Sequence, residues 1–238
     1  MNVVITGASK GIGKAIAAAF AETGAHLLLC ARNETALYNT VAELQTRFPS
    51  STIQAKVVDL AVKEAAVEFG NWVLSLLQQT PSGKLDILVN NAGTFLPGSI
   101  HEEPDGHLET MMNTNLYSAY HLTRTLVPHL VAARQGLIVN LCSIASLHAY
   151  PNGGSYSISK FALMGFGKNL REELKPHQVK VMNIYPGAVM TDSWGDFDNT
   201  SGRIMEASDI SAMVLAAAKL SPQAVVEDIV LRPLLGDV

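Results

Sequence analysis

The stretch Thr6-Gly7-Ala8-Ser9-Lys10-Gly11-Ile12-Gly13 decides the fold, because it joins a short apolar strand to an amphipathic helix. Its glycines at 7, 11 and 13 allow a tight turn and leave no Cβ between the backbone and a ligand. The free N–H groups at the start of the following helix, 12–23, would face a pyrophosphate. Any tight turn uses glycine, so the loop is informative because a strand precedes it and a helix follows it. The stretch therefore predicts a phosphate-binding turn.

Runs rich in valine, isoleucine and leucine alternate with helical patterns along the rest of the chain. The expected strands are 3–6, 26–30, 53–58, 86–89, 136–141, 179–185 and 229–231. The expected helices include 12–23, 34–48, 62–79, 113–134 and 156–174. Several strands are apolar throughout, which is typical of strands covered on both faces. The pattern predicts one α/β Rossmann-fold domain over 1–238, a doubly wound seven-stranded parallel sheet with helices on both faces.

Two segments depart from this regular alternation. Residues 194–203 are rich in glycine, aspartate and asparagine, so we expect a polar, flexible loop there, serving as a lid or as disordered surface. Pro128 lies late in the expected helix 113–134 and predicts a kink or an early stop.

Composition excludes several classes of protein. The chain has 238 residues, 48% of them hydrophobic, which excludes intrinsic disorder. Its net charge is −4 and no basic block occurs, so we expect no nucleic-acid partner. The seven histidines show no metal-ligand spacing, and we expect no metal.

Cysteine use and the longest uncharged stretch indicate the compartment. Cys30 and Cys142 lie inside apolar runs, where buried thiols are expected, and two cysteines make no disulfide framework. The uncharged stretch 135–159 contains Asn140 and Pro151, which excludes a membrane-spanning helix. The first residues resemble no signal peptide. We therefore expect a cytoplasmic protein with no membrane partner.

The glycine spacing is G-x-x-x-G-x-G, which differs from the dinucleotide fingerprint G-x-G-x-x-G. At this point the chain resembles the short-chain dehydrogenase/reductase superfamily. The resemblance recurs, in order, at Asn90-Asn91-Ala92-Gly93, Asn115, Ser143, Tyr156-Ser157-Ile158-Ser159-Lys160, and Pro186-Gly187 with Thr191. Ser143 and Tyr156 are 13 positions apart, the usual spacing of that family. Within it, 191–195 and the ending 231–237 look like bacterial sepiapterin reductase-like carbonyl reductases.

Tyr156 and Lys160 carry the expected chemistry. They are four residues apart on one helix, so their side chains share a face. An ammonium beside a phenol lowers the phenol's pKa from about 10, so we expect Tyr156 to act as general acid and base. The resemblance implies that Ser143 holds the substrate oxygen, that Lys160 also binds the nicotinamide ribose, and that Asn115 holds a relay water. Hydride passing directly from the nicotinamide would reduce a ketone to an alcohol.

Each motif alone has a plainer interpretation. A Tyr-x-x-x-Lys pair is common on amphipathic helices, Ser143 fits an ordinary strand end, and Asn115 fits a helix surface. Residues 90–93 fit a polar turn. The motifs occur together in the family's order and spacing, which favours the enzyme. A non-catalytic cofactor sensor is a further hypothesis about function, and such a sensor would be expected to lack Tyr156 or Lys160.

Cofactor choice depends on the end of the second expected strand. NAD-preferring enzymes carry an acid there, whereas this chain has Ala31 followed by Arg32, with Lys10 in the glycine loop. Two cations and no acid favour a 2′-phosphate, so we predict NADP(H) over NAD(H). The alternative is that both are solvated charges. The resemblance places Asp59 at the adenine ring, although Asp59 could equally cap the helix 62–79. The implied cofactor contacts are Gly7, Ser9, Lys10, Gly11, Ile12, Gly13, Arg32, Asp59, Asn91, Ala92, Gly93, Tyr156, Lys160, Pro186, Gly187, Val189 and Thr191.

Substrate contacts are expected from the segment after Ser143 and from a loop at about 187–207. The candidates are Ile144, Tyr150, Met190 and Trp194. Their apolar and aromatic surface favours a planar or apolar ketone, either pterin-like or a small diketone, although Trp194 could instead anchor its loop. The alternative function is a 3-oxoacyl-[acyl-carrier-protein] reductase of fatty-acid synthesis, but those enzymes usually end in a Gly-Gly-Met tail that this chain lacks. The resemblance also implies a homodimer or homotetramer.

Overall fold

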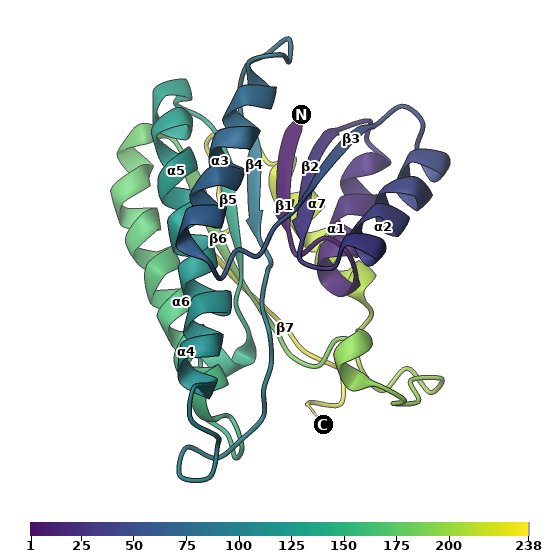
Figure 1. The fold of residues 1–238 in the computed structure, drawn as a ribbon, viewed down its shortest axis with the longest axis vertical. Coiled ribbons are helices and arrows are strands. Elements are labelled where there is room, and N and C mark those ends of the chain that lie inside the picture. The colour runs from purple at the N-terminus through teal and green to yellow at the C-terminus, as the bar shows by residue number, and fades with distance from the viewer. Residues whose placement is uncertain (238) are drawn as a thin grey trace.

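The computed structural model describes residues 1–237 (Figure 1). Its strands are β1 (Asn2–Thr6), β2 (His26–Ala31), β3 (Thr52–Val57), β4 (Ile87–Asn90), β5 (Leu137–Leu141), β6 (Lys180–Pro186) and β7 (Asp228–Leu231). Its α-helices are α1 (Gly11–Ala21), α2 (Glu34–Arg47), α3 (Lys63–Leu77), α4 (His107–Met111), α5 (Ser118–Ala133), α6 (Gly154–Leu174) and α7 (Ala207–Ala218).

The strands form one parallel sheet in the order β3-β2-β1-β4-β5-β6-β7. The prediction of a doubly wound seven-stranded parallel sheet is therefore confirmed. The strand order reverses between β1 and β4, and ligands of such sheets bind where the carboxyl ends of the strands flank this point.

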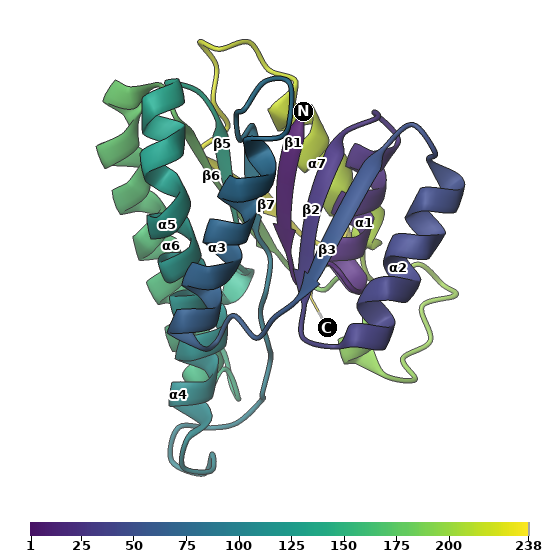
Figure 2. The same cartoon turned by 45° about the horizontal axis from the view of Figure 1, so that its top comes forward.

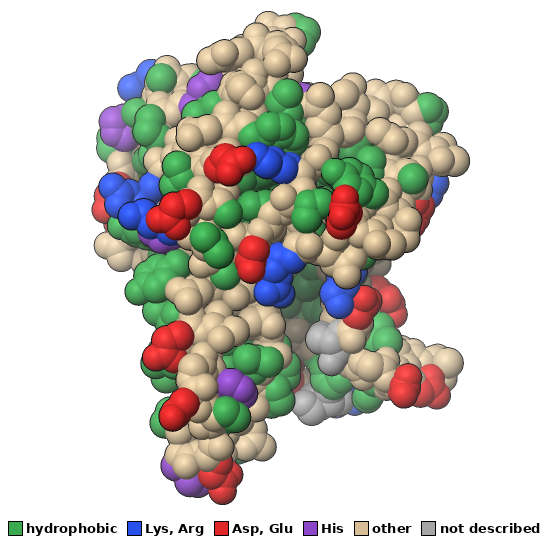
Figure 3. Space-filling view, in the orientation of Figure 1, with side chains coloured by type: hydrophobic (Ala, Val, Ile, Leu, Met, Phe, Trp, Pro, Cys, Tyr) green, Lys and Arg blue, Asp and Glu red, His purple; other side chains and the backbone are tan. Residues whose placement is uncertain are grey.

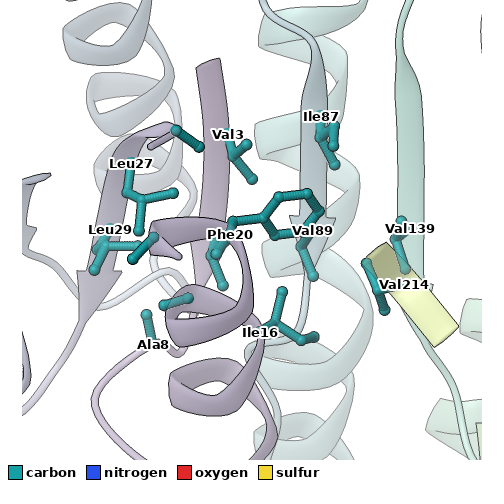
Figure 4. Packing of buried hydrophobic residues seen from close by; sticks show 14 of the residues in the cluster. Val3, Ala8, Ile16, Phe20, Leu27, Leu29, Ile87, Val89, Val139 and Val214 are labelled. Carbon is teal, nitrogen blue, oxygen red and sulfur yellow. The ribbon is translucent and has the colours of Figure 1, made fainter. Parts of the chain in front are cut away.

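Helices cover both faces of the sheet. Helices α1, α2 and α7 lie on one side, and α3, α5 and α6 lie on the other, as both ribbon views show (Figures 1 and 2). On the first side, Ile16 and Phe20 of α1 are four residues apart and fully buried against β1 and β4 (Figure 4). Burying such a side chain contributes about 1.5–3 kcal/mol. The β1–α1 unit, which presents the glycine loop, is thus anchored by its apolar stripe.

The helices differ from expectation in five respects. The segment expected as one helix over 113–134 begins as a π-helix, Met112–Tyr117, and continues as α5. The predicted early stop at Pro128 does not occur, because α5 continues past Pro128 to Ala133. Helices α4 and α7 were not expected from the pattern, and a 3₁₀ turn, Asp192–Trp194, opens the loop predicted to be flexible.

Both cysteines are buried free thiols, as predicted. Burial raises the pKa of the Cys142 thiol to about 12. Among residues 1–237, no helix has the length and apolar character that a membrane crossing requires.

Candidate active site

The glycine loop turns as its sequence predicts. Gly7 and Gly11 have φ of +64° and +55°, a region that favours glycine. A Cβ at Gly13 would lie 2.4 Å from both the Gly7 carbonyl oxygen and Asn91 Nδ2, so only glycine fits. The turn therefore presents bare backbone at the start of α1.

A second strand end holds this loop in place. The Asn91 side-chain amide donates to the carbonyl oxygens of Thr6 (2.8 Å) and Gly7 (3.1 Å). In return, the Thr6 hydroxyl accepts hydrogen bonds from the backbone N–H groups of Asn91 and Ala92, both at 2.9 Å. The motif at 90–93 therefore cross-links the ends of β1 and β4. An ordinary polar turn, the plainer interpretation of these residues, would not require these four hydrogen bonds.

A cleft of about 860 Å³ opens at the carboxyl ends of the strands. Figure 3 shows the molecule hollowed on this side. Of the predicted site residues, its lining includes Lys10, Gly11, Ile12, Arg32, Asn91, Gly93, Ser143, Ile144, Tyr150, Tyr156, Lys160, Pro186, Gly187, Val189, Thr191 and Trp194. Those in the described chain that lie outside the lining are Gly7, Ser9, Gly13, Asp59, Ala92, Asn115 and Met190.

Tyr156 lies in the first turn of α6, and Ser143 lies just after β5, where its side chain accepts a hydrogen bond from Ala145 N (3.1 Å). Tyr156 and Ser143 line the same part of the cleft. Burial raises the pKa of Tyr156, while the nearby Ser143 side chain lowers it by less. The prediction that Lys160 brings this pKa below its usual value is therefore wrong for this structure, because the cost of desolvating a phenolate is the larger effect.

Lys160 is only 6% exposed, one turn after Tyr156. Its ammonium donates to the Leu141 carbonyl oxygen at 2.7 Å and lies 5.8 Å from the centre of the Tyr156 ring. Burial lowers the pKa of Lys160 from 10.5 to about 8. The lysine is thus a buried amine whose pKa is about 8.

Asn115 occupies the π-helical segment and is 1% exposed. Its carboxamide oxygen accepts from Thr94 N (2.7 Å), and its amide nitrogen donates to the Thr94 carbonyl oxygen (3.0 Å) and to Ser159 Oγ (2.8 Å). Both amide hydrogens are therefore used in positioning other residues. The relay water implied by the resemblance can use neither of them.

The two cations expected to select the cofactor lie at the rim of the cleft. Arg32 follows β2 and is exposed, and Lys10 forms an exposed ion pair with Asp192 at 3.3 Å. Asp59 is exposed outside the lining, and its carboxylate accepts from Ala61 N at 3.0 Å. The N-cap of α3 is Val62, so the interpretation of Asp59 as a helix cap is wrong.

The predicted substrate residues divide into two groups. Ile144, Tyr150 and Trp194 line the cleft, and Trp194 also packs on Phe197 with ring centroids 5.1 Å apart, so the two interpretations of Trp194 are compatible. Met190 instead pairs its backbone with Met205 (N–H to carbonyl oxygen, 2.7 Å), which joins the two ends of the 187–207 loop.

The C-terminal tail is a wall of the cleft that sequence reasoning missed. Val230, Arg232 and Asp237 all belong to the lining. Arg232 forms a two-pronged ion pair with Asp237, in which Nε lies 2.8 Å from Oδ2. Arg203, from the loop before α7, donates to the carbonyl oxygens of Gly236 (2.8 Å) and Asp237 (3.1 Å). The contacts of Arg203 join residues 33 and 34 positions apart, so no local sequence pattern predicts them.

Thr94 and Phe95 were also missed. Both line the cleft, and the Phe95 ring meets Tyr156 edge-to-face, with centroids 4.8 Å apart and planes at 77°. The position of Phe95, two residues after the 90–93 motif, was the available signal.

Comparison with known proteins agrees with this geometry. The family model described as short chain dehydrogenase matches residues 1–201. The chain belongs to the short-chain dehydrogenase family. It is 31% identical over 245 residues to sepiapterin reductase of Chlorobaculum tepidum, covering 99% of this chain and 97% of that protein.

Solved structures of the family share the whole fold. An alcohol dehydrogenase from Thermococcus sibiricus, complexed with 5-hydroxy-NADP, has a TM-score of 0.90 at 27% identity, covering 100% of this chain and 98% of that one. L-sorbose reductase from Gluconobacter frateurii, complexed with NADPH and L-sorbose, has a TM-score of 0.84 at 27% identity, covering 97% and 94%. The prediction of an oxidoreductase of this family, with similarity to sepiapterin reductase, is confirmed.

Proposed function

We propose that this protein is an NADP(H)-dependent reductase that converts a ketone to an alcohol, with Tyr156 as general acid. The observation that carries the proposal is the grouping of Tyr156, Ser143 and the buried Lys160 in one cleft that continues to the glycine loop. The sugar, alcohol and pterin names of the relatives agree with carbonyl and alcohol chemistry.

The cleft fits an NADP molecule. At the glycine loop, a Cβ on Gly11 would lie 3.2 Å from Thr191, so the cradle depends on bare backbone. Arg32 and Lys10 supply positive charge at the same rim, which suits the 2′-phosphate. The two solved relatives described above hold NADP-type cofactors. The bound cofactor would supply the hydride, and Lys160 and the 186–191 segment would hold its nicotinamide end.

The chain's own residues manage the proton. The raised pKa keeps the Tyr156 hydroxyl protonated at neutral pH, which is the form that a reduction needs as proton donor. Ser143 lines the cleft beside that hydroxyl, so a carbonyl oxygen directed at Tyr156 also meets the serine. Lys160, with a pKa of about 8, can return a proton to the tyrosine side of the site. Ile144, Tyr150 and Trp194 add apolar and aromatic surface to the cleft, which supports a planar or apolar ketone, pterin-like or a small diketone.

NADPH oxidation at 340 nm tests the proposal. Purified wild type is offered a small diketone, sepiapterin and an acetoacetyl thioester. We expect turnover of the diketone or of sepiapterin, and a 10²- to 10⁴-fold loss of kcat, on the order given for general acid catalysis, in Tyr156→Phe. Tyr38→Phe, at an exposed tyrosine on α2 outside the cleft lining, is the matched control and should stay within about threefold of wild type. Preference for the thioester would instead support the 3-oxoacyl reductase, and full activity of Tyr156→Phe would refute the mechanism.

We further propose a homodimer or homotetramer in the cytoplasm. Helix α6 leaves Ile158 and Phe161 about two-fifths exposed (42% and 39%), which is apolar surface that a second copy would cover. The two free thiols favour a reducing compartment. Light scattering that finds only monomer at micromolar concentration would contradict the assembly.

A further inference from the structure

The loop between β4 and α4 carries an aromatic wall of the cleft. Phe95 is 43% exposed, yet its ring packs edge-to-face on the ring of Tyr156, with the ring centroids 4.8 Å apart. Edge-to-face pairs of this kind favour one relative orientation of the two rings. The remaining surface of Phe95 faces the cleft that Ser143 and Tyr156 also line.

The backbone of Phe95 is held from its N-terminal side. Asn115 binds the preceding residue, Thr94, through both its N–H (2.7 Å) and its carbonyl oxygen (3.0 Å). Asn115 is itself buried and bonded to Ser159 on α6 at 2.8 Å. A single carboxamide therefore joins the loop to the helix that carries Tyr156.

The other end of the loop is fixed to the start of the same helix. Gly98 N donates to the Asn152 carbonyl oxygen (3.1 Å), and Ser99 Oγ donates to Asn152 Oδ1 (2.9 Å). Glu103 then accepts hydrogen bonds from the hydroxyl and the backbone N–H of Ser155, the residue before Tyr156. Because Ser155 N belongs to the first turn of α6, the Glu103 carboxylate also satisfies an otherwise orphaned donor and lies at the positive end of the helix dipole.

We infer that Phe95 is a specificity-determining residue that selects carbonyl compounds bearing an aromatic or flat apolar substituent beside the reacting carbon. The inference rests on the reductase function proposed above. A carbonyl oxygen bound at Tyr156 places its carbon, and what that carbon carries, next to a ring packed on Tyr156. A flat substituent gains ring contact there, whereas a short alkyl group leaves the exposed ring surface wetted.

Phe95→Leu and two diketones test this selection. The probes are 1-phenyl-1,2-propanedione, which carries a phenyl group, and 2,3-butanedione, which carries only methyl groups. We expect Phe95→Leu to lower the ratio of kcat/KM for the aryl over the alkyl compound about three- to tenfold, the range that corresponds to loss of one aromatic pair. NADPH affinity should not change. Ile100→Ser, at an exposed residue on the same loop outside the cleft lining, is the matched control.

Binding is measured as well as turnover. Isothermal titration of the aryl and alkyl diketones into protein saturated with NADP⁺ gives a preference that does not depend on catalysis. A smaller aryl preference in Phe95→Leu than in wild type supports the assignment even if neither compound is reduced, and that outcome would count against the reductase function alone. An unchanged preference in both measurements, or no aryl preference in wild type, overturns the assignment whether or not the protein reduces ketones.

Discussion

The two sides of the cleft are built differently. On the glycine-loop side, the ends of β1 and β4 are locked by four hydrogen bonds between Thr6, Gly7, Asn91 and Ala92, and every residue of β1 is buried. On the substrate side, the wall consists of loops and the tail, where Trp194 and Tyr150 are partly or largely exposed. The tail is fixed chiefly by two arginines, Arg203 and Arg232.

This difference matches what each side binds. The glycine-loop side is proposed to bind one cofactor, and a rigid backbone cradle needs no ordering when that cofactor binds. Substrates differ between relatives, and loops tolerate such variation because little of the core depends on them. We therefore expect substitutions on the glycine-loop side to affect folding and cofactor binding together, and those on the substrate side to affect KM alone.

The largest effect should come from Gly13→Ala. The added Cβ would clash with the Gly7 carbonyl and Asn91, so the backbone must move, and we expect a loss of about 3 kcal/mol in the free energy of unfolding. Urea denaturation measures this loss, and NADPH titration should show a parallel loss of affinity. Gly165→Ala in α6 is the matched control, because no described atom outside its own helix lies within 4 Å of that Cβ and alanine favours helix by about 1 kcal/mol. Equal stability of Gly13→Ala and wild type would contradict the rigid cradle.

Arg32→Ala sharpens the comparison at the cofactor rim. Loss of a charge-assisted contact to the 2′-phosphate should weaken NADPH binding about tenfold or more, about 1.5–3 kcal/mol, and leave NADH binding unchanged. Fluorescence titration with both cofactors measures the difference. Arg47→Ala removes another exposed arginine, on α2, that pairs with Glu43 at 3.2 Å and should change neither affinity. Equal loss for both cofactors would show that Arg32 does not recognise the phosphate.

Lys160 should make stability depend on pH. Its pKa is about 8 in the folded protein, against 10.5 ordinarily, so between these values the unfolded chain binds more protons than the folded one. The free energy of unfolding should therefore rise with pH from about 8 to 10.5, by up to about 1.4 kcal/mol per pH unit from this group. Subtracting the profile of Lys160→Met isolates that rise from the titration of other groups. Parallel profiles for the two proteins would contradict the depressed pKa.

Arg203→Ala tests the substrate side and should have the smallest effect. Without its two hydrogen bonds to the carbonyls of Gly236 and Asp237, the tail should be held less firmly. We expect KM for the carbonyl substrate to rise about fivefold, corresponding to about 1 kcal/mol, with NADPH affinity unchanged. Arg171→Ala, which breaks an ion pair with Glu227 (2.8 Å), is the control. A loss of NADPH affinity in Arg203→Ala would contradict the expectation that substitutions on the substrate side change KM alone.

Much of this protein could be predicted from its sequence. Hydrophobic periodicity predicts the strands and the parallel sheet, because strands covered on both faces are apolar throughout. The glycine spacing and the order of the later motifs predict the family. The spacing of Tyr156 and Lys160 places both on one face of α6, since that relation depends only on helix geometry.

Only the tertiary structure decides how burial acts on these groups. The spacing of Tyr156 and Lys160 predicts a lowered pKa for Tyr156, whereas burial raises it, and burial depends on elements distant in the chain. Phe95 and the tail reach the cleft through long-range contacts, which no local pattern contains.

The polar residues inside the apolar strands give the same lesson. Asn90, Asn140 and Asn183 lie side by side on β4, β5 and β6. The amides of Asn90 and Asn140 each donate to the next carboxamide oxygen at 3.0 Å, and the Asn183 amide donates to Asp228 Oδ1 at 3.3 Å. Burying an amide costs less when its hydrogen bonds are made. The sequence shows three asparagines in three strands, and only the register of the sheet shows that their side chains bond to one another, although Asn90 Oδ1 has no partner among the described residues.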